Sequence, residues 1–217
     1  MNSSTLRITV LAVIVLFSTT VSAQTVPAGF VMFDTVRSIK LDIRYKTANN
    51  FTGSALYPAE WKTYLHPLAA ERLIKAAMIL KAKEPRLTLV VLDATRPVSI
   101  QKKLYEKVRG TPLARYVSSS GGTSMHNYGL ALDCTIIEET GKELDMGTKY
   151  DEFIPLSEPR FEEKHLKEGK LTQEQYLNRR FLREVMRQAG LRPIQNEWWH
   201  FEAVRKKELN GKYKVVE

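Results

Sequence analysis

The sequence predicts an α+β fold: a single domain with a central, mainly antiparallel sheet flanked by helices. The 217 residues suffice for one well-cored domain, and no linker-like stretch divides them. Short apolar runs rich in β-branched residues indicate buried strands, whereas apolar residues at helical spacing indicate helices. The elements do not alternate as strict βαβ units, so a doubly wound parallel sheet is not expected.

The first half of the chain supplies a strand, a helix and a second strand. Residues 39–43 alternate apolar and polar side chains, which predicts a short strand. Residues 67–84 repeat apolar side chains at helical spacing, and Pro85 ends the helix. The run LTLVVLDA, residues 87–94, predicts a buried strand that ends at Asp93.

The second half supplies two helices and two strands. Residues 97–108 suit a helix with proline near its first turn, and 129–137 predict a buried strand. The clearest helix lies within 171–190, where Thr172 opens a capping box and a glycine ends the pattern. The aromatic stretch EWWHFEAV, residues 197–204, is the last strand candidate.

The first 23 residues have the anatomy of a secretory signal peptide. One basic residue precedes an apolar core, and a small-x-small ending predicts cleavage after Ala23. The apolar core is shorter than the roughly 20 residues that span a bilayer, which disfavours an uncleaved anchor. We therefore expect an exported, periplasmic protein, residues 24–217, without a stable membrane anchor.

Charge and cysteine usage limit the classes of partner. The formal net charge is +9, but basic residues are interspersed with acids, as in RFEEKHLKEGK. This mixture is typical of a solvated surface, so we expect no nucleic-acid partner. Cys134 is the single cysteine, which excludes intramolecular disulfides and leaves the fold to rest on its core. The oligomeric state stays open.

Charged and imidazole side chains cluster at the ends of the predicted strands. They form three pairs: Asp93 with Arg96, His126 with Asp133, and Glu197 with His200. Charges beside buried strands must be paired or bound to metal, because an uncompensated buried charge is costly. Two imidazoles and one carboxylate as ligands, with a second carboxylate as base, match a catalytic zinc site with an open fourth position.

The spacing of these residues limits the backbone geometries that could bring their side chains to one metal ion. His126 and Asp133 lie an odd number of positions apart, so on one regular strand they would face opposite sides of the sheet. Both reach one metal only if His126 lies in the loop before the strand or the strand is bulged, with Gly129 as the natural break. Glu197 and His200 similarly require an irregular turn or a strand end.

The remaining tryptophans and histidines of interest favour ordinary structural roles. Trp198 and Trp199 are expected to pack the core, one on each face of the last strand. His66 and His165 lack an apolar setting in the sequence, so we expect them at the surface.

Sequence blocks covering most of the chain resemble a known family. SMHNYGLALD followed by EWWH resembles the S-x-H-x-x-G-x-A-x-D and E-x-W-H signatures of zinc D,D-peptidases. Within that superfamily, DIRYKTANNFTG, DATRP, TGKELDMGTKYD and NRRFLREVMRQAGLRPIQNEWWH resemble the D-Ala-D-Ala dipeptidases. The resemblance implies the Hedgehog/D,D-peptidase type of α+β fold. It also implies hydrolysis of D-Ala-D-Ala with one Zn²⁺ per chain, in cell-wall peptide salvage or remodelling.

The resemblance also implies roles for residues at matching positions. Three residues become zinc ligands: His126, Asp133 and His200. Glu197 becomes the general base and acid, and Arg96 the cation beside the scissile carbonyl.

Substrate contacts and supporting residues complete the implied site. Ser124 and Asp151 become substrate contacts, with Asp151 near the substrate ammonium. Asp93 either orients Arg96 through a charge-assisted hydrogen bond or caps the following helix. Thr95 departs from the tyrosine expected in close relatives, which affects the expected shape of the pocket.

Two alternative functions stay open at this point. One is a D,D-carboxypeptidase or endopeptidase acting on intact peptidoglycan stem peptides, which an open groove would favour. The other is a non-catalytic zinc-binding or cell-wall-binding protein, for which Glu197 would be unnecessary. A dipeptidase instead needs a pocket closed at both ends, with walls expected from residues 45–60 and 138–170.

Overall fold

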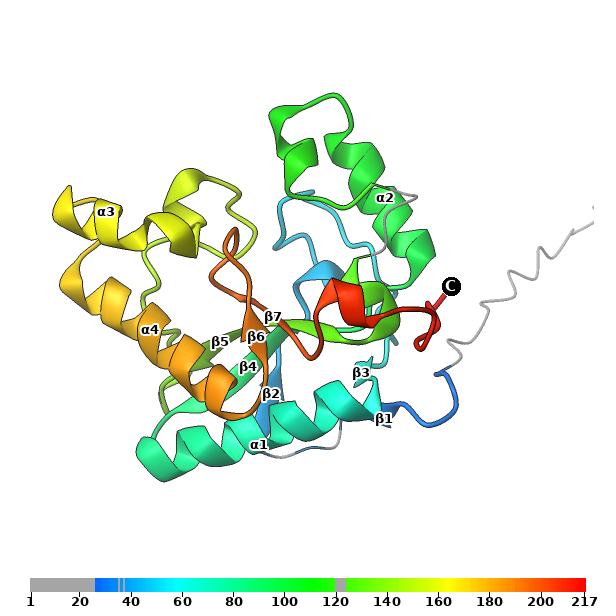
Figure 1. The fold of residues 1–217 in the computed structure, drawn as a ribbon, viewed down its shortest axis with the longest axis horizontal. Helices are drawn as coiled ribbons and strands as arrows, with labels where there is room; N and C mark the ends of the chain where they lie inside the picture. The colour runs from blue at the N-terminus through cyan, green and yellow to red at the C-terminus, as the bar shows by residue number, and fades with distance from the viewer. Residues whose placement is uncertain (1–25, 35, 37, 120–123) are drawn as a thin grey trace, which may run out of the picture.

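The computed structural model describes residues 26–34, 36, 38–119 and 124–217, so the expected signal peptide lies outside the described residues. Five strands form the central sheet in the order β2-β4-β5-β7-β6 (Figure 1). Their bounds are β2 Ile39–Leu41, β4 Thr88–Asp93, β5 Ala131–Ile137, β7 His200–Glu202 and β6 Arg192–Pro193. Among the strands of the described residues, β2 and β4 are the one parallel pair, which confirms the mainly antiparallel α+β prediction.

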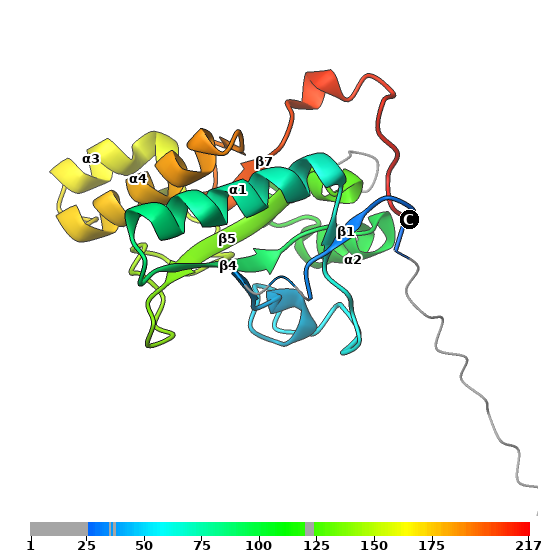
Figure 2. The same cartoon turned by 90° about the horizontal axis from the view of Figure 1, so that it is seen from below.

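The helices gather mainly on one face of this sheet. They are α1 Pro67–Lys83, α2 Val98–Val108, α3 Glu162–Lys167 and α4 Gln173–Gln188. Helices α1 and α4 lie side by side across one face, whereas the segment with the short 3-10 helix η1, Arg44–Lys46, lies on the other (Figures 1 and 2). A separate pair of short strands, β1 Val31–Met32 and β3 Tyr64–Leu65, was not expected from the sequence.

Local sequence signals explain where the long helices begin. Thr172 and Gln175 form the predicted capping box of α4. The N-cap of α1 is His66, whose Nδ1 accepts a hydrogen bond from the backbone N–H of Leu68 at 3.2 Å. His66 is therefore half-buried by its capping role rather than free at the surface.

His165 was also expected at the surface, and this expectation is wrong. Its side chain is buried, and its Nε2 lies 3.2 Å from the carbonyl oxygen of Pro155. The sequence around it is charged because α3 exposes its other faces, while this imidazole turns inward. A local sequence pattern does not reveal which side of so short a helix is covered.

The last strand is shorter than predicted. Only His200–Glu202 is extended in the sheet, and Trp198 and Trp199 lie in the bend before it. Both tryptophans are buried, with ring centroids 5.3 Å apart and planes at 86°. The expected placement on opposite faces of one strand is wrong because neither residue belongs to the strand, although both pack the core.

Two local irregularities of the backbone, a 3-10 helix before β5 and a register shift in β4, set the positions of the predicted site residues. Met125–Tyr128 form a 3-10 helix, η3, that ends at Gly129 with a φ of +65°. A side chain at this glycine would meet the Thr95 hydroxyl at 2.7 Å and the His66 backbone nitrogen at 2.8 Å, so the close approach requires glycine. The register between β4 and β5 shifts after Val91, which brings Asp93 opposite Asp133.

Two further properties of the fold bear on the chain's environment. Cys134 is a buried, free thiol in the core. In the described ranges, none of the helices is long and apolar enough to cross a membrane.

Candidate metal centre

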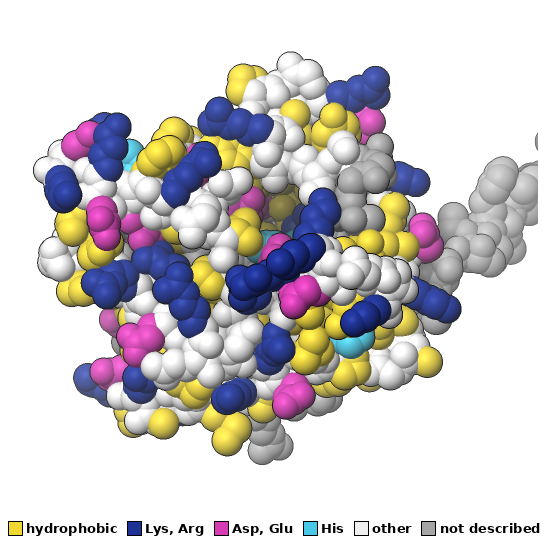
Figure 3. Space-filling model, viewed as in Figure 1, with side chains coloured by type: hydrophobic (Ala, Val, Ile, Leu, Met, Phe, Trp, Pro, Cys, Tyr) yellow, Lys and Arg dark blue, Asp and Glu magenta, His cyan; other side chains and the backbone are white. Residues whose placement is uncertain are grey.

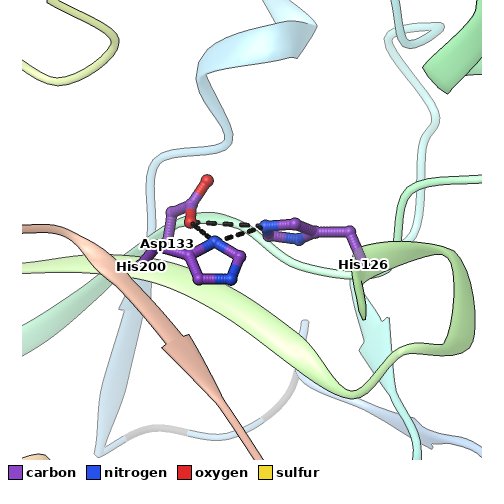
Figure 4. Close-up of side chains that lie close together, drawn as sticks. All are labelled: His126, Asp133 and His200. Carbon is purple, nitrogen blue, oxygen red and sulfur yellow. Dashed lines mark hydrogen bonds and ion pairs between the residues drawn. The ribbon is translucent and has the colours of Figure 1, made fainter. Parts of the chain in front are cut away.

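Three potential metal-ligating side chains converge at the sheet (Figure 4). His126 comes from η3, Asp133 from β5 and His200 from the start of β7. Asp133 Oδ1 lies 3.0 Å from His200 Nδ1 and 3.3 Å from His126 Nε2. The two imidazole nitrogens are 3.1 Å apart.

Strand pairing and the η3 turn explain this convergence. Asp133 and His200 are direct antiparallel partners, so their side chains emerge on the same face of the sheet. His126 reaches them from the turn before β5, which resolves the odd spacing without a bulge between the two residues. The structure thus brings together the three residues that the sequence predicted; their metal-ligating role stays a prediction.

The donor atoms fit a metal ion. The Nδ1–H of His126 donates to the carbonyl oxygen of Ala94 at 2.6 Å, which leaves the Nε2 lone pair aimed at Asp133. The Nε2 of His200 lies 3.5 Å from Glu202 Oε1, so a proton held there leaves Nδ1 as a third acceptor. Three buried acceptor atoms that face one another form a group that could hold a metal ion.

Electrostatics agree with this interpretation. Burial alone would raise the pKa of Asp133, but His126 and His200 hold it well below its usual range. Burial would lower the pKa of His200, yet Asp133 and Glu202 raise it to about 10. Metal binding would therefore displace a proton from this cluster.

Two supporting residues escaped the sequence analysis. The hydroxyl of Tyr150 donates to Asp133 Oδ2 at 3.0 Å, and Glu202 faces His200 as described. Glu202 follows His200 by two positions on one strand, so the strand period would have placed both on the same face. Tyr150 comes from an irregular loop, where no periodic signal exists.

Arg96 is held rigidly beside the three ligands. Its Nε and Nη2 donate to Asp93 Oδ2 at 2.9 and 2.6 Å, and its Nη1 donates to Gln101 Oε1 at 3.0 Å. Asp93 Oδ1 also accepts a hydrogen bond from Tyr57 at 2.9 Å. Asp93 therefore orients Arg96 and does not cap α2, whose N-cap is Pro97. Arg96 Nη2 lies 3.9 Å from Asp133 Oδ2.

Two further carboxylates face the same space. Glu197 precedes the bend before β7, and burial raises its pKa to about 7. Asp151 is 6% exposed and has a φ of 60°. Burial, followed by the charge of Asp133, raises the pKa of Asp151 well above its ordinary value. Its Oδ2 has no hydrogen-bond partner within the described part of the chain.

One cavity of about 270 Å³ unites these groups, and Figure 3 shows it as a hollow with basic side chains around its rim. All the predicted site residues line it except Asp93, which lies behind Arg96. Tyr45, Phe51 and Phe153 contribute walls from the two expected loops. Additional walls that the sequence analysis missed come from the segment after α2, including Arg115, Tyr116 and Val117.

A family model and the known proteins with similar sequences carry the same description. A family model described as "D-ala-D-ala dipeptidase" matches residues 27–216. A D-alanyl-D-alanine dipeptidase of Escherichia coli is 33% identical over 164 residues, which are 76% of this chain and 78% of that protein. One of Enterococcus faecalis is 26% identical over 196 residues, covering 81% and 92% of the two chains. The family match spans the whole candidate site.

Proposed function

The chain belongs to the D-ala-D-ala dipeptidase family and is a metallopeptidase, and we propose that it hydrolyses D-Ala-D-Ala to two D-alanines at one zinc ion. His126, Asp133 and His200 would hold that ion. Two imidazoles and one carboxylate suit zinc, and three protein ligands leave a fourth position for chemistry.

Glu197 supplies the proton transfers in this proposal. When bound, zinc lowers the pKa of a water molecule to about 7 and polarises a carbonyl oxygen. Glu197, with its pKa raised to about 7, accepts a proton from the attacking water. As the water oxygen bonds to the peptide carbon and the C–N bond breaks, Glu197 returns the proton to the leaving amine. A protein that only bound zinc would not need this carboxylate.

Arg96 stabilises the negative charge that develops on the carbonyl oxygen. Its guanidinium is fixed by Asp93 and Gln101, so little reorganisation is needed during the reaction. A preorganised donor of this kind contributes about 3 to 4 kcal/mol to transition-state stabilisation. Ser124, which lines the cavity at the N-cap of η3, is proposed as a second substrate contact.

Asp151 carries the choice of substrate. A buried carboxylate with an unpaired oxygen beside the cavity is complementary to a free ammonium group. A free dipeptide presents that ammonium next to the scissile bond, whereas an intact stem peptide presents a neutral amide there. This observation favours the dipeptidase over the carboxypeptidase or endopeptidase alternative.

The proposal also includes export of the protein from the cytoplasm. The signal-like first 23 residues support a periplasmic location, where the enzyme would salvage D-Ala-D-Ala released from peptidoglycan. Fractionation of expressing cells should recover a chain that starts near residue 24 in the periplasm. Recovery of the full-length chain in the cytosol would refute export.

Product analysis tests the activity. Zinc-loaded protein is incubated separately with D-Ala-D-Ala, N-acetyl-D-Ala-D-Ala, L-Ala-L-Ala and a pentapeptide stem ending in D-Ala-D-Ala. We expect D-alanine mainly from the free D,D-dipeptide. Cleavage of the pentapeptide alone would establish the carboxypeptidase alternative, and absence of cleavage would support a binding protein.

A further inference from the structure

A buried arginine connects α4 to the loop that carries Asp151. Arg179 is 1% exposed, and a guanidinium at such depth must find partners for its donors. Its Nε donates to the carbonyl oxygen of Met146 at 2.5 Å, and its Nη1 donates to that of Leu156 at 2.8 Å. Its Nη2 donates to Thr148 Oγ1 at 3.3 Å. One side chain thus holds both ends of residues 146–156, hereafter the substrate loop.

The substrate loop contributes two side chains to the site but contains little regular structure of its own. Tyr150 contacts Asp133, and Asp151 presents its unpaired oxygen beside the cavity. The backbone of Asp151 is in the left-handed region, which costs a non-glycine residue conformational free energy, although less for aspartate than for most others. Contacts from outside the loop therefore help to keep this carboxylate in place.

A second set of hydrogen bonds connects the substrate loop to the segment that contains the proposed general base. Thr148 Oγ1 also accepts a hydrogen bond from Trp198 Nε1 at 2.9 Å, and it lies 3.0 Å from Ser157 Oγ, which donates its own proton to the carbonyl oxygen of Glu152. Trp198 directly follows Glu197 in the chain. Thr148 therefore joins the substrate loop to the segment that carries the proposed base, and Arg179 donates to the same oxygen.

We propose that Arg179 is a positioning residue for recognition of the substrate ammonium, acting through the substrate loop and Asp151. This inference rests on the proposed function. The planar fork of arginine reaches two carbonyl oxygens and a hydroxyl at once, which the single ammonium of lysine does not reproduce. Loss of the fork frees the loop, so Asp151 pairs with the substrate less often.

Arg183 offers a matched control. It lies one helical turn further along α4, and its two terminal nitrogens donate to Glu162 at 2.7 and 2.5 Å. Arg179 Nη1 also pairs with Glu162, at 3.5 Å. Both arginines therefore interact with one buried acid, but among these two it is Arg179 that donates hydrogen bonds to the substrate loop.

Steady-state kinetics of zinc-loaded Arg179→Lys and Arg183→Lys test the proposal. For Arg179→Lys we expect KM for D-Ala-D-Ala to rise roughly tenfold or more while kcat changes less than about threefold; for Arg183→Lys, KM changes less than about twofold. In an Asp151→Asn background, Arg179→Lys should add less than about twofold to KM. An equal KM rise in Arg183→Lys, an unchanged KM in Arg179→Lys, or full additivity with Asp151→Asn would overturn the proposal.

A readout without substrate separates this inference from the proposed function. Amide hydrogen exchange of residues 146–156 should accelerate roughly tenfold or more in Arg179→Lys and remain unchanged in Arg183→Lys. If the wild-type protein does not cleave D-Ala-D-Ala, the proposed function fails, while unchanged exchange in Arg179→Lys refutes the positioning role. If Arg179→Lys does not fold, Thr148→Val replaces it, with the same direction of effect in both measurements.

Discussion

The metal centre and the substrate loop face one cavity but are built in different ways. Strand pairing fixes Asp133 opposite His200, and a tight turn ending at a required glycine delivers His126. The substrate loop has no strand pairing, and its two ends accept hydrogen bonds from Arg179 on α4. The proposed reactive groups thus lie on paired strands and a tight turn, whereas the proposed ammonium contact lies on a loop that Arg179 contacts from outside.

Because of this difference, substitutions in the two regions should impair different steps of the proposed reaction. Changes in the metal centre should reduce the chemical step, because its residues are proposed to act on the reacting atoms. Changes in the substrate loop should reduce recognition of the ammonium, because Asp151 is proposed to contact that group. The following experiments sharpen or break this division, beginning with the largest expected effect.

Glu197→Gln should lower kcat by about 10³-fold and change KM little, because the variant cannot accept a proton from water. Single-turnover kinetics on zinc-loaded protein measures the loss, and metal analysis confirms that zinc remains bound. Activity near the wild-type level would assign proton transfer to another group.

Arg96→Lys should lower kcat by about 10²-fold, since a single ammonium cannot keep the bonds to Asp93 and Gln101 while facing the carbonyl oxygen. Asp93→Asn should act in the same direction with a smaller loss, because the guanidinium remains but loses its charged anchor. A change confined to KM in Arg96→Lys would contradict the assignment to the chemical step.

Asp151→Asn should raise KM for D-Ala-D-Ala roughly tenfold to a hundredfold, which corresponds to the loss of a hydrogen bond between charged groups. The kcat value should change much less. Preference for the free dipeptide over N-acetyl-D-Ala-D-Ala should shrink in parallel. A fall in kcat with an unchanged KM would break the division between the two regions.

The last prediction concerns stability and pH rather than catalysis. In metal-free protein, burial raises the pKa of Glu197 from 4.5 to about 7, so the unfolded chain releases this proton at lower pH. Rising pH therefore destabilises the folded protein between these two values, by at most about 3 kcal/mol. The glutamine variant titrates no proton at this position, so its Tm advantage over wild type should grow by several degrees across that range. A constant Tm difference would show that the carboxyl group is not desolvated.

Zinc supplies the control for the stability experiment. Its positive charge favours the ionised carboxylate, so the pH-dependent Tm difference should shrink in zinc-loaded protein. An equal dependence with and without zinc would place Glu197 outside the electrostatic reach of the metal site.

Local patterns predicted the two central strands and the long helices of the scaffold. The apolar runs predicted β4 and β5 within two residues at each end, and the capping box located the start of α4. The residue types and the glycine predicted the grouping of His126 with Asp133, because a charge in a buried strand requires compensation. These inferences depend on a few neighbouring residues, which is why one sequence contains them.

Long-range relations were not accessible in the same way. The register shift in β4 that sets Asp93 opposite Asp133 arises from pairing between distant strands. Tyr150, Arg179 and the inward turn of His165 depend on which loop packs against which helix. No periodicity in the sequence encodes these contacts, so the structure was needed to find the restraint on the substrate loop.

Zinc titration of metal-free protein, followed by release of D-alanine from D-Ala-D-Ala, tests the central claim most directly. Activity should rise linearly and reach a plateau at one zinc per chain, and His126→Ala and His200→Ala should show no such rise. Activity that is independent of zinc, or that survives in both histidine variants, would contradict a catalytic metal at this centre.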